Sequence, residues 1–471
     1  MFTRRTLMAG GAATVATFAH TQVTVAQTPS VTDTEREAIL SALETMAQHG
    51  LDPADYRRGG SDPVRAWKQA GAHLLRGRLD PVSVEPDWTA PRRTADIDAA
   101  FDAARAKGDF AGGLESLAPK QAGYGALLAE LARVRALSGV AQITVPAGPS
   151  LKEGQSGARV EAMQAALAAR GFAPASPLGT FDAATADALR AFQDDAGLDA
   201  DAVAGPATLA ALNRSGSDRV EALRVNLERW RWLPDDLGRR HLRVNIAGFR
   251  TDAWEDGAIA QTHLAIVGKP FRKTPVFSDA VRYIVLNPWW ETPASLARAD
   301  KLPLFKRDPG AVQRLGFQVL DRNGQLVSNV DWNAVPAGTM PYRIRQAPGP
   351  ANALGQVKIM FPNRHNVYLH DTPTRDLFAR RQRAFSSGCI RTQDPIGLSK
   401  WLLRDTPGWD AARIDAAVES GKETRADLSA TVPVHILYNT VVAEEGGGIR
   451  YLDDIYGRDA KVLAGLDAGR A

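Results

Sequence analysis

The first half of the chain carries apolar residues at the three- and four-residue spacing of amphipathic helices. Residues 34–37 fit a capping box at the start of the first such stretch, and Gly50 is a natural stop for it. A later stretch repeats the pattern. The positions that carry the two patterns are Ile39, Leu43, Met46, Leu127, Leu131 and Val134. The spacing predicts a helical scaffold over residues 31–147.

Apolar residues also recur at helical spacing over residues 151–213, which follow a proline- and glycine-containing linker at 146–150. One apolar stripe ends near Gly171, a second follows the turn at 179–182, and Pro206 opens a third. The stripe residues are Val160, Met163, Leu167, Ala188, Leu189, Phe192, Leu209 and Leu212. They predict a small bundle of three short helices.

The pattern changes in the second half of the chain, where apolar and polar residues alternate as in half-buried strands. A helix rich in tryptophan and arginine, predicted over residues 217–234, leads into this region. The segments that alternate or form short apolar runs are 242–246, 263–267, 281–286, 367–370 and 434–438. We therefore predict a β-rich domain over residues 240–459 and a multidomain α+β fold for the whole chain.

Between about residues 287 and 345 the alternation is lost, and prolines and tryptophans are frequent. A connection of this length is unusual inside a compact domain. We interpret the segment as a lid or an inserted subdomain that caps the site of the β-rich domain.

Composition places the chain among folded proteins with several modest cores, since 44% of its 471 residues are hydrophobic and 23% are charged. The formal net charge of +4 is small for this length. A weakly basic surface suits anionic polymers of the cell envelope as well as nucleic acid, so charge does not identify the partner.

The first 26 residues have the features of an export signal, and they are set aside from the fold. Arg4 and Arg5 precede an apolar run at 8–19, and small residues at 24–26 suit a signal peptidase. The paired arginines favour the Tat route, with a Sec signal as the alternative. Either route predicts a periplasmic protein. No later stretch reaches the roughly 20 apolar residues that a membrane-spanning helix needs.

Export makes the single cysteine informative, because one cysteine excludes an intramolecular disulfide. A lone thiol in an oxidising compartment is either buried and inert or needed for chemistry. The count alone leaves both interpretations open.

The setting of Cys389 favours chemistry. It lies in the sequence SSGCIR at 386–391, and His370 ends a predicted strand upstream. A cysteine attacks carbonyl groups as its thiolate, which a neighbouring histidine can generate. Gly388 allows close backbone approach, so the amides of Gly388 and Cys389 can stabilise an oxyanion. Arg391 falls on the same face as Cys389 in an extended chain, where it can bind a carboxylate or brace the loop.

A metal site is the alternative for the histidines. His365 and His370 are separated by five residues, which predicts opposite faces of a strand. No cysteine or further histidine nearby completes a zinc set. We therefore predict neither a metal nor a cofactor.

Two segments carry family resemblances. Residues 151–213 resemble a three-helix peptidoglycan-binding module, through a pattern that includes FD at 181–182 and FQ at 192–193. His370 together with SSGCIR at 386–391 resembles the active-site signature of L,D-transpeptidases with a YkuD catalytic domain. Further segments resemble the large YcbB-like subclass, in which a helical scaffold and a peptidoglycan-binding module precede a catalytic domain with a capping insertion. These segments are 50–53, 228–234, 267–270, 341–343, 361–364 and 454–457.

The resemblance implies peptidoglycan stem peptides and glycan strands as partners. Cys389 would attack the carbonyl of meso-diaminopimelate in a tetrapeptide donor and release D-alanine, with His370 as base. An amine of a neighbouring stem would then resolve the thioester as a 3→3 cross-link. Acylation by carbapenems is implied as well. The residues expected to contact the substrate, besides Gly388 and Arg391, are Tyr368, Asp371, Ser386 and Ser387.

Three alternatives remain at this point. A sortase also uses histidine, cysteine and arginine in that order, but the threonine-rich setting of its cysteine is absent here. An L,D-carboxypeptidase or amidase would use the same site with water as acceptor. A non-catalytic wall-binding protein would explain residues 151–213 without needing Cys389. Protein partners and oligomeric state are not predicted.

Overall fold

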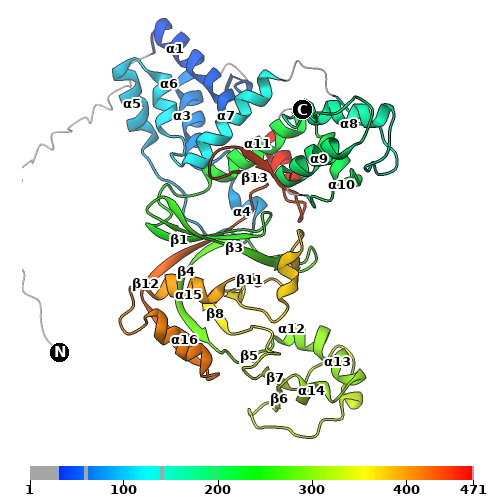
Figure 1. Cartoon of the computed structure of the whole chain (residues 1–471). Helices are drawn as coiled ribbons and strands as arrows, with labels where there is room; N and C mark the ends of the chain where they lie inside the picture. The colour runs from blue at the N-terminus through cyan, green and yellow to red at the C-terminus, as the bar shows by residue number, and fades with distance from the viewer. Residues whose placement is uncertain (1–30, 58–61, 138–142, 197, 469–471) are drawn as a thin grey trace, which may run out of the picture.

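Figure 1 shows the computed structural model of the chain, which describes residues 31–57, 62–137, 143–196 and 198–468. The export signal predicted over residues 1–26 lies outside the described residues. Within these ranges, no helix combines the length and the apolar character needed to cross a membrane.

The N-terminal part of the chain is helical, as predicted. Its capping box lies two residues before the predicted one. The Thr32 hydroxyl accepts a hydrogen bond from the Glu35 amide at 3.2 Å, and the Glu35 carboxylate accepts one from the Thr32 amide at 2.9 Å. Gly50 ends the segment in the left-handed region, at a φ of 73° that glycine adopts without steric cost. The helices are α1 (Asp33–Glu44), α2 (Ala54–Arg57), α3 (Pro63–Arg76), α4 (Pro81–Val84), α5 (Ile97–Lys107), α6 (Phe110–Ser116) and α7 (Ala122–Ala136).

The predicted three-helix module is also present, as α8 (Ala158–Ala168), α9 (Ala183–Asp195) and α10 (Pro206–Leu212). Its apolar side chains form a core of their own, separate from the core of the rest of the chain. Among the core residues are Val160, Met163, Leu167, Phe181, Leu189, Phe192 and Leu212. The module therefore packs around a hydrophobic core of its own.

Helix α11 (Gly216–Arg231) connects the module to the C-terminal domain and packs against α7. Its Arg231 and Glu228 form a fully buried ion pair at 2.8 Å. One hydrophobic core runs from the scaffold helices through α11 into the C-terminal sheet. The scaffold and the sheet domain thus share a core, which the sequence analysis did not predict.

Nine strands form the central sheet in the order β10-β3-β11-β9-β8-β4-β12-β1-β2, and a further pairing of β2 with β3 closes the sheet on itself. Figure 1 shows the sheet below the scaffold, with α15 (Pro395–Leu403) and α16 (Ala411–Glu419) beside it. The strands are β1 (Arg240–Asn245), β2 (Arg250–Glu255), β3 (Ala258–Gly268), β4 (Phe277–Leu286), β8 (Val357–Met360), β9 (Leu369–His370), β10 (Ala384–Ser386), β11 (Ile390–Thr392) and β12 (Thr424–Leu437).

Two strands differ in length from the prediction. β9 keeps only two residues of the predicted strand 367–370, because residues 363–368 form a turn held by the Asn363 side chain. β12 is 14 residues long, whereas the predicted strand covered only residues 434–438. The additional residues of β12 lie before that segment. After β12 come β13 (Val441–Ala443), β14 (Ile449–Tyr451) and helix α17 (Asp459–Asp467), which packs on α11.

The segment predicted as an irregular insertion is folded. It contains a three-stranded sheet in the order β5-β7-β6, several short helical segments and its own hydrophobic core around Phe305 and Trp332. Figure 1 shows it at the end of the molecule opposite the scaffold. Its main elements are β5 (Trp290–Glu291), α12 (Ala294–Leu296), a π-helical turn (Ala297–Lys301), α13 (Leu302–Arg307), α14 (Ala311–Arg314), β6 (Phe317–Leu320) and β7 (Arg343–Gln346).

Candidate active site

The pairing of β9 with β11 brings the candidate catalytic residues together. The two strands are parallel, with Leu369 opposite Ile390 and His370 opposite Arg391. Leu369 and Ile390 are buried in the main core. Because side chains alternate along a strand, His370 and Arg391 face the other way. Tyr368 directly precedes Leu369, and Cys389 directly precedes Ile390. By the same alternation, Tyr368 and Cys389 share the side of His370 and Arg391. All four line one cavity of about 1120 Å³.

The turn that carries Cys389 is held by Ser386. The Ser386 hydroxyl is buried, donates a hydrogen bond to the Cys389 carbonyl at 2.5 Å and accepts one from the Gly388 amide at 3.1 Å. Gly388 has a φ of 119°, which favours glycine. This arrangement corrects one prediction. The Gly388 amide is occupied by Ser386 and is not available to an oxyanion. Ser386 lines the cavity and also supports the turn from within.

The Cys389 amide remains available for the role predicted for it. Among the hydrogen bonds between described residues, none uses this N–H group. The Cys389 sulfur is partly exposed and lies 3.6 Å from the Asn366 carbonyl oxygen. A carbonyl group that approaches the sulfur can therefore meet one free amide donor on the same residue.

The local electrostatics favour neutral forms of both key residues. Burial, with a smaller contribution from the nearby Arg391, lowers the pKa of His370 to about 3, so the imidazole is neutral near pH 7. Burial raises the pKa of the Cys389 thiol, although Tyr368, Lys358 and Arg391 act in the opposite direction. Both shifts favour a neutral imidazole and a neutral thiol over a thiolate–imidazolium pair.

A neutral His370 can act as a proton acceptor. Its Nδ1 has no hydrogen-bond partner among the described residues, although the side chain is buried. A buried polar atom without a partner costs stability and is common where a site awaits a ligand or a proton. This feature fits a general base better than a structural histidine.

One of the two remaining predicted contacts differs in the structure. Asp371 does not line the cavity, because its carboxylate accepts hydrogen bonds from Arg375 at 2.8 Å and from the Gln356 amide at 3.0 Å. It follows His370 in the chain and points away from the side of the sheet that carries the cavity. Ser387, in contrast, is exposed, lines the cavity as its predicted role requires, and accepts a hydrogen bond from Arg272 at 3.0 Å.

His365 does not lie on a strand opposite His370. It sits in the turn before β9, lines the same cavity, and its Nε2 is 3.7 Å from Asp87 of the scaffold domain. In the described ranges, no three histidine, cysteine, aspartate or glutamate side chains gather in a metal-binding arrangement.

Sequence reasoning missed several cavity residues. Lys358 on β8 lies 4.2 Å from the Tyr368 ring centre, and burial lowers its pKa. Its alternation with the core residues Val357 and Ile359 was a signal that it faces the cavity. The insertion also contributes to the wall, through Trp290, Leu296, Asp300 and Lys301. Only the folded insertion brings these residues over Cys389.

Known protein families match three segments of the chain. Residues 27–131 match a scaffold domain, residues 156–212 match a peptidoglycan-binding domain, and residues 239–414 match the L,D-transpeptidase catalytic domain named YkuD. The chain contains a YkuD L,D-transpeptidase catalytic domain. The three matches follow the order that the resemblance implied, and that prediction is confirmed.

One curated protein is similar to about half of the chain. A curated Haemophilus influenzae protein named as an L,D-transpeptidase is 36% identical over 248 residues, which are 52% of this chain and 50% of that protein. The chain thus spans about half the length of the curated relative it matches.

Solved structures of L,D-transpeptidases are more distant. One from Xylanimonas cellulosilytica is 17% identical, with a TM-score of 0.20 over 62% of this chain and 99% of that chain. L,D-transpeptidase 1 of Mycobacterium tuberculosis is 12% identical, with a TM-score of 0.17 over 42% of this chain and 61% of that chain. Scores of this size add nothing to the family assignment.

The buried histidines predict an acid limit to stability. Burial lowers the pKa of His370 to about 3 and the pKa values of His73 and His241 to about 4, against 6.5 for an exposed histidine. Below pH 6.5 the unfolded chain binds protons that the folded chain excludes. The free energy of unfolding should therefore fall as the pH drops from 6.5 to 4, by about 1.4 kcal/mol per histidine and pH unit.

Thermal melting at intervals between pH 8 and pH 4.5 measures this effect. The melting temperature should be level above pH 7 and decline steadily below pH 6.5. A melting temperature that rises or stays constant between pH 6.5 and pH 5 would contradict the neutral state of these histidines.

Proposed function

We propose that the protein is an L,D-transpeptidase that forms 3→3 cross-links in peptidoglycan through an acyl-enzyme on Cys389. The observation that carries the proposal is the placement of Cys389, His370 and Arg391 on one side of the β9–β11 pair, inside a cavity of about 1120 Å³. A cavity of this size accommodates an extended peptide stem. We further propose that the protein acts in the periplasm after export, with neither cofactor nor metal.

Acylation begins when the donor carbonyl of meso-diaminopimelate reaches the Cys389 sulfur. The S–C bond forms as the thiol proton moves to His370, so no free thiolate has to accumulate beside the neutral imidazole. The negative charge moves to the carbonyl oxygen, where the Cys389 amide can donate a hydrogen bond. The intermediate then collapses, the C–N bond breaks, and D-alanine leaves with the proton from His370.

Deacylation reverses these roles. The side-chain amine of a neighbouring stem attacks the thioester carbonyl, and His370 accepts the proton from the nitrogen. The C–S bond breaks and the proton returns to sulfur, which regenerates the thiol. The cross-link keeps the energy of the amide bond that was cleaved, since the thioester conserves it.

The charges around Cys389 suit an anionic donor stem. Lys358 and Arg391 both line the cavity, and burial lowers the pKa values of both groups because it disfavours their charged forms. A carboxylate of the stem would offset this cost by pairing with them. Arg391 also donates a hydrogen bond to the Thr374 hydroxyl at 3.0 Å, which orients its guanidinium.

The product of the reaction tests the proposal. Purified protein is incubated with disaccharide-tetrapeptides that contain meso-diaminopimelate, and the products are separated and weighed by mass spectrometry. We expect 3→3 dimers and free D-alanine in equal amounts. Tripeptide monomers without dimers would indicate an L,D-carboxypeptidase, and unchanged substrate would indicate a wall-binding protein.

The insertion is proposed to hold the donor stem, and one ion pair joins it to the active-site turn. Arg272 donates hydrogen bonds to both oxygens of Asp300 in the insertion, at 2.8 and 3.1 Å, and to Ser387 at 3.0 Å. Asp300→Asn should loosen this contact and lower the rate with tetrapeptide donors roughly two- to five-fold, the range of an exposed ion pair. Acylation by a small carbapenem should change less, because it needs no capping.

Asp308→Asn is the matched control. Asp308 forms an ion pair with Arg314 in the same insertion, but neither residue lines the cavity. This variant should keep both rates. Equal losses with tetrapeptide and carbapenem in Asp300→Asn would show that the ion pair supports the fold and does not hold the stem.

A further inference from the structure

The turn that carries Cys389 is held from outside by the β3–β4 loop, residues 269–276, and by Gly268 at the end of β3. Thr274 of this loop is fully buried, and its hydroxyl donates a hydrogen bond to the Gly388 carbonyl at 2.9 Å. The same hydroxyl accepts a hydrogen bond from the Gly268 amide at 2.9 Å. The Lys269 amide adds a hydrogen bond to the Ser386 carbonyl at 3.0 Å.

The bond from Thr274 has a direct consequence for Cys389. The Gly388 carbonyl and the Cys389 amide belong to one planar peptide unit, in which C=O and N–H point in opposite directions. A donor that holds the carbonyl on one side therefore aims the N–H group to the other side. The Cys389 N–H is the group proposed above to stabilise the oxyanion, and Thr274 sets its direction.

The β3–β4 loop is in turn closed by Tyr456. Its hydroxyl donates a hydrogen bond to the Gly268 carbonyl at 2.5 Å and accepts one from the Thr274 amide at 3.2 Å, so it joins the two ends of the loop. The ends approach so closely that a Cβ on Gly268 would lie 2.1 Å from the Arg272 carbonyl oxygen. Lys273 donates a hydrogen bond to the Tyr456 carbonyl at 2.7 Å.

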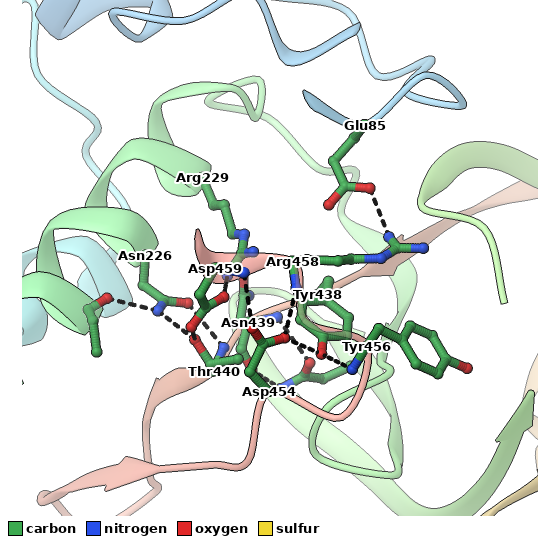
Figure 2. Close-up of polar contacts among 12 residues, drawn as sticks. Glu85, Asn226, Arg229, Tyr438, Asn439, Thr440, Asp454, Tyr456, Arg458 and Asp459 are labelled. Carbon is green, nitrogen blue, oxygen red and sulfur yellow. Dashed lines mark hydrogen bonds and ion pairs between the residues drawn. The ribbon is translucent and has the colours of Figure 1, made fainter. Parts of the chain in front are cut away.

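Figure 2 shows how Tyr456 is anchored. The Asp454 carboxylate accepts hydrogen bonds from the Tyr438 hydroxyl at 2.6 Å and from the Arg458 amide at 2.9 Å. The Tyr438 hydroxyl in turn accepts one from the Tyr456 amide at 2.8 Å. The Arg458 guanidinium reaches Glu85 of the scaffold at 2.7 Å and the Thr274 carbonyl at 3.2 Å.

We propose that Thr274 and Tyr456 are positioning residues that aim the Cys389 amide at the oxyanion. Glu85 of the scaffold contributes to this positioning through Arg458. This inference rests on the proposed function, in which Cys389 is the nucleophile. Neither residue contacts the reacting atoms. Their effect is geometric, because an oxyanion donor that is rotated away contributes little to the rate.

Two reactions of Cys389 separate this role from general support of the fold. Acylation by a carbapenem passes through an oxyanion, whereas alkylation by iodoacetamide is a displacement at carbon that forms none. Thr274→Val and Tyr456→Phe should therefore slow carbapenem acylation at least about ten-fold and leave the alkylation rate within about two-fold of the original protein. Thr274→Ser keeps the hydroxyl and should restore acylation. Intact-mass spectrometry measures both rates.

Thr251→Val is the matched control. Thr251 is also fully buried, and its hydroxyl has no hydrogen-bond partner among the described residues. This variant should keep both rates. Acylation rates within two-fold of the original in Thr274→Val and Tyr456→Phe, or an equal change of acylation and alkylation, would overturn the proposal. In the unaltered protein, an adduct on a residue other than Cys389 would refute the proposed function instead.

Glu85→Gln tests whether the scaffold contributes to the positioning of the Cys389 amide. It removes the charge that Arg458 faces but keeps the shape of the side chain, so acylation should fall less than in Tyr456→Phe and alkylation should not change. An acylation rate equal to that of the unaltered protein would show that the scaffold does not contribute to this positioning.

Discussion

The Cys389→Ala variant is expected to form no 3→3 dimers and no covalent adduct with a carbapenem. The chain has a single cysteine, so no other thiol can replace it. Loss of the nucleophile from an acyl-transfer site lowers the rate by about four to six orders of magnitude. Product analysis by mass spectrometry measures the first effect. Intact mass with a carbapenem measures the second, with the adduct of the unaltered protein expected in the peptide that contains residues 386–391.

Cys389→Ser is the graded companion of this variant. It should react far more slowly than cysteine, because a hydroxyl is scarcely ionised near neutral pH. Melting temperatures of both variants should remain close to that of the original protein, since the sulfur is only partly buried. Dimer formation by folded Cys389→Ala at the original rate would refute the proposed mechanism.

His370→Ala should lower the rates of acylation and cross-linking by about 100-fold or more at pH 7, the lower range for a missing general base. The thiol that remains has a raised pKa and no proton acceptor. Its reactivity should therefore recover as the pH rises to 9 and above, because hydroxide then removes the proton. Carbapenem acylation across this pH range measures both the loss and the recovery.

His263→Gln is the matched control for His370→Ala. His263 is a buried histidine of β3 whose Nε2 lies 3.0 Å from Gln261, and it does not line the cavity. Its substitution should change the rates by no more than a few-fold. A His370→Ala variant that keeps most of its activity at pH 7 would assign the base to another group.

The candidate site was predictable where its residues are close in sequence. The sequence at 386–391 and the histidine upstream are local patterns, and they pointed to one site whose residues the structure does bring together. Alternation along β9 also explains the wrong prediction for Asp371. Neighbouring residues of a strand face opposite sides, so His370 and Asp371 could not both line the cavity.

The prediction for the Gly388 amide was wrong for a different reason. A glycine before the nucleophile suggested a free oxyanion donor, but Ser386 accepts its hydrogen bond two residues earlier in the chain. Several local partners can satisfy a backbone amide, and the sequence does not show which one does. The turn conformation selected Ser386 and left the Cys389 amide as the donor.

The sequence by itself determined the order of scaffold, peptidoglycan-binding module and catalytic domain. It also predicted that Cys389 and His370 belong to one site. Periodicity and short motifs carry that information, because both depend on neighbours along the chain. Only the tertiary structure decided that the scaffold and the sheet share one core, that the insertion folds over Cys389, and that Tyr456 closes a loop 182 residues before it. Hydrophobic burial is not directional, so a pattern shows which side chains are buried but not which distant partners they meet.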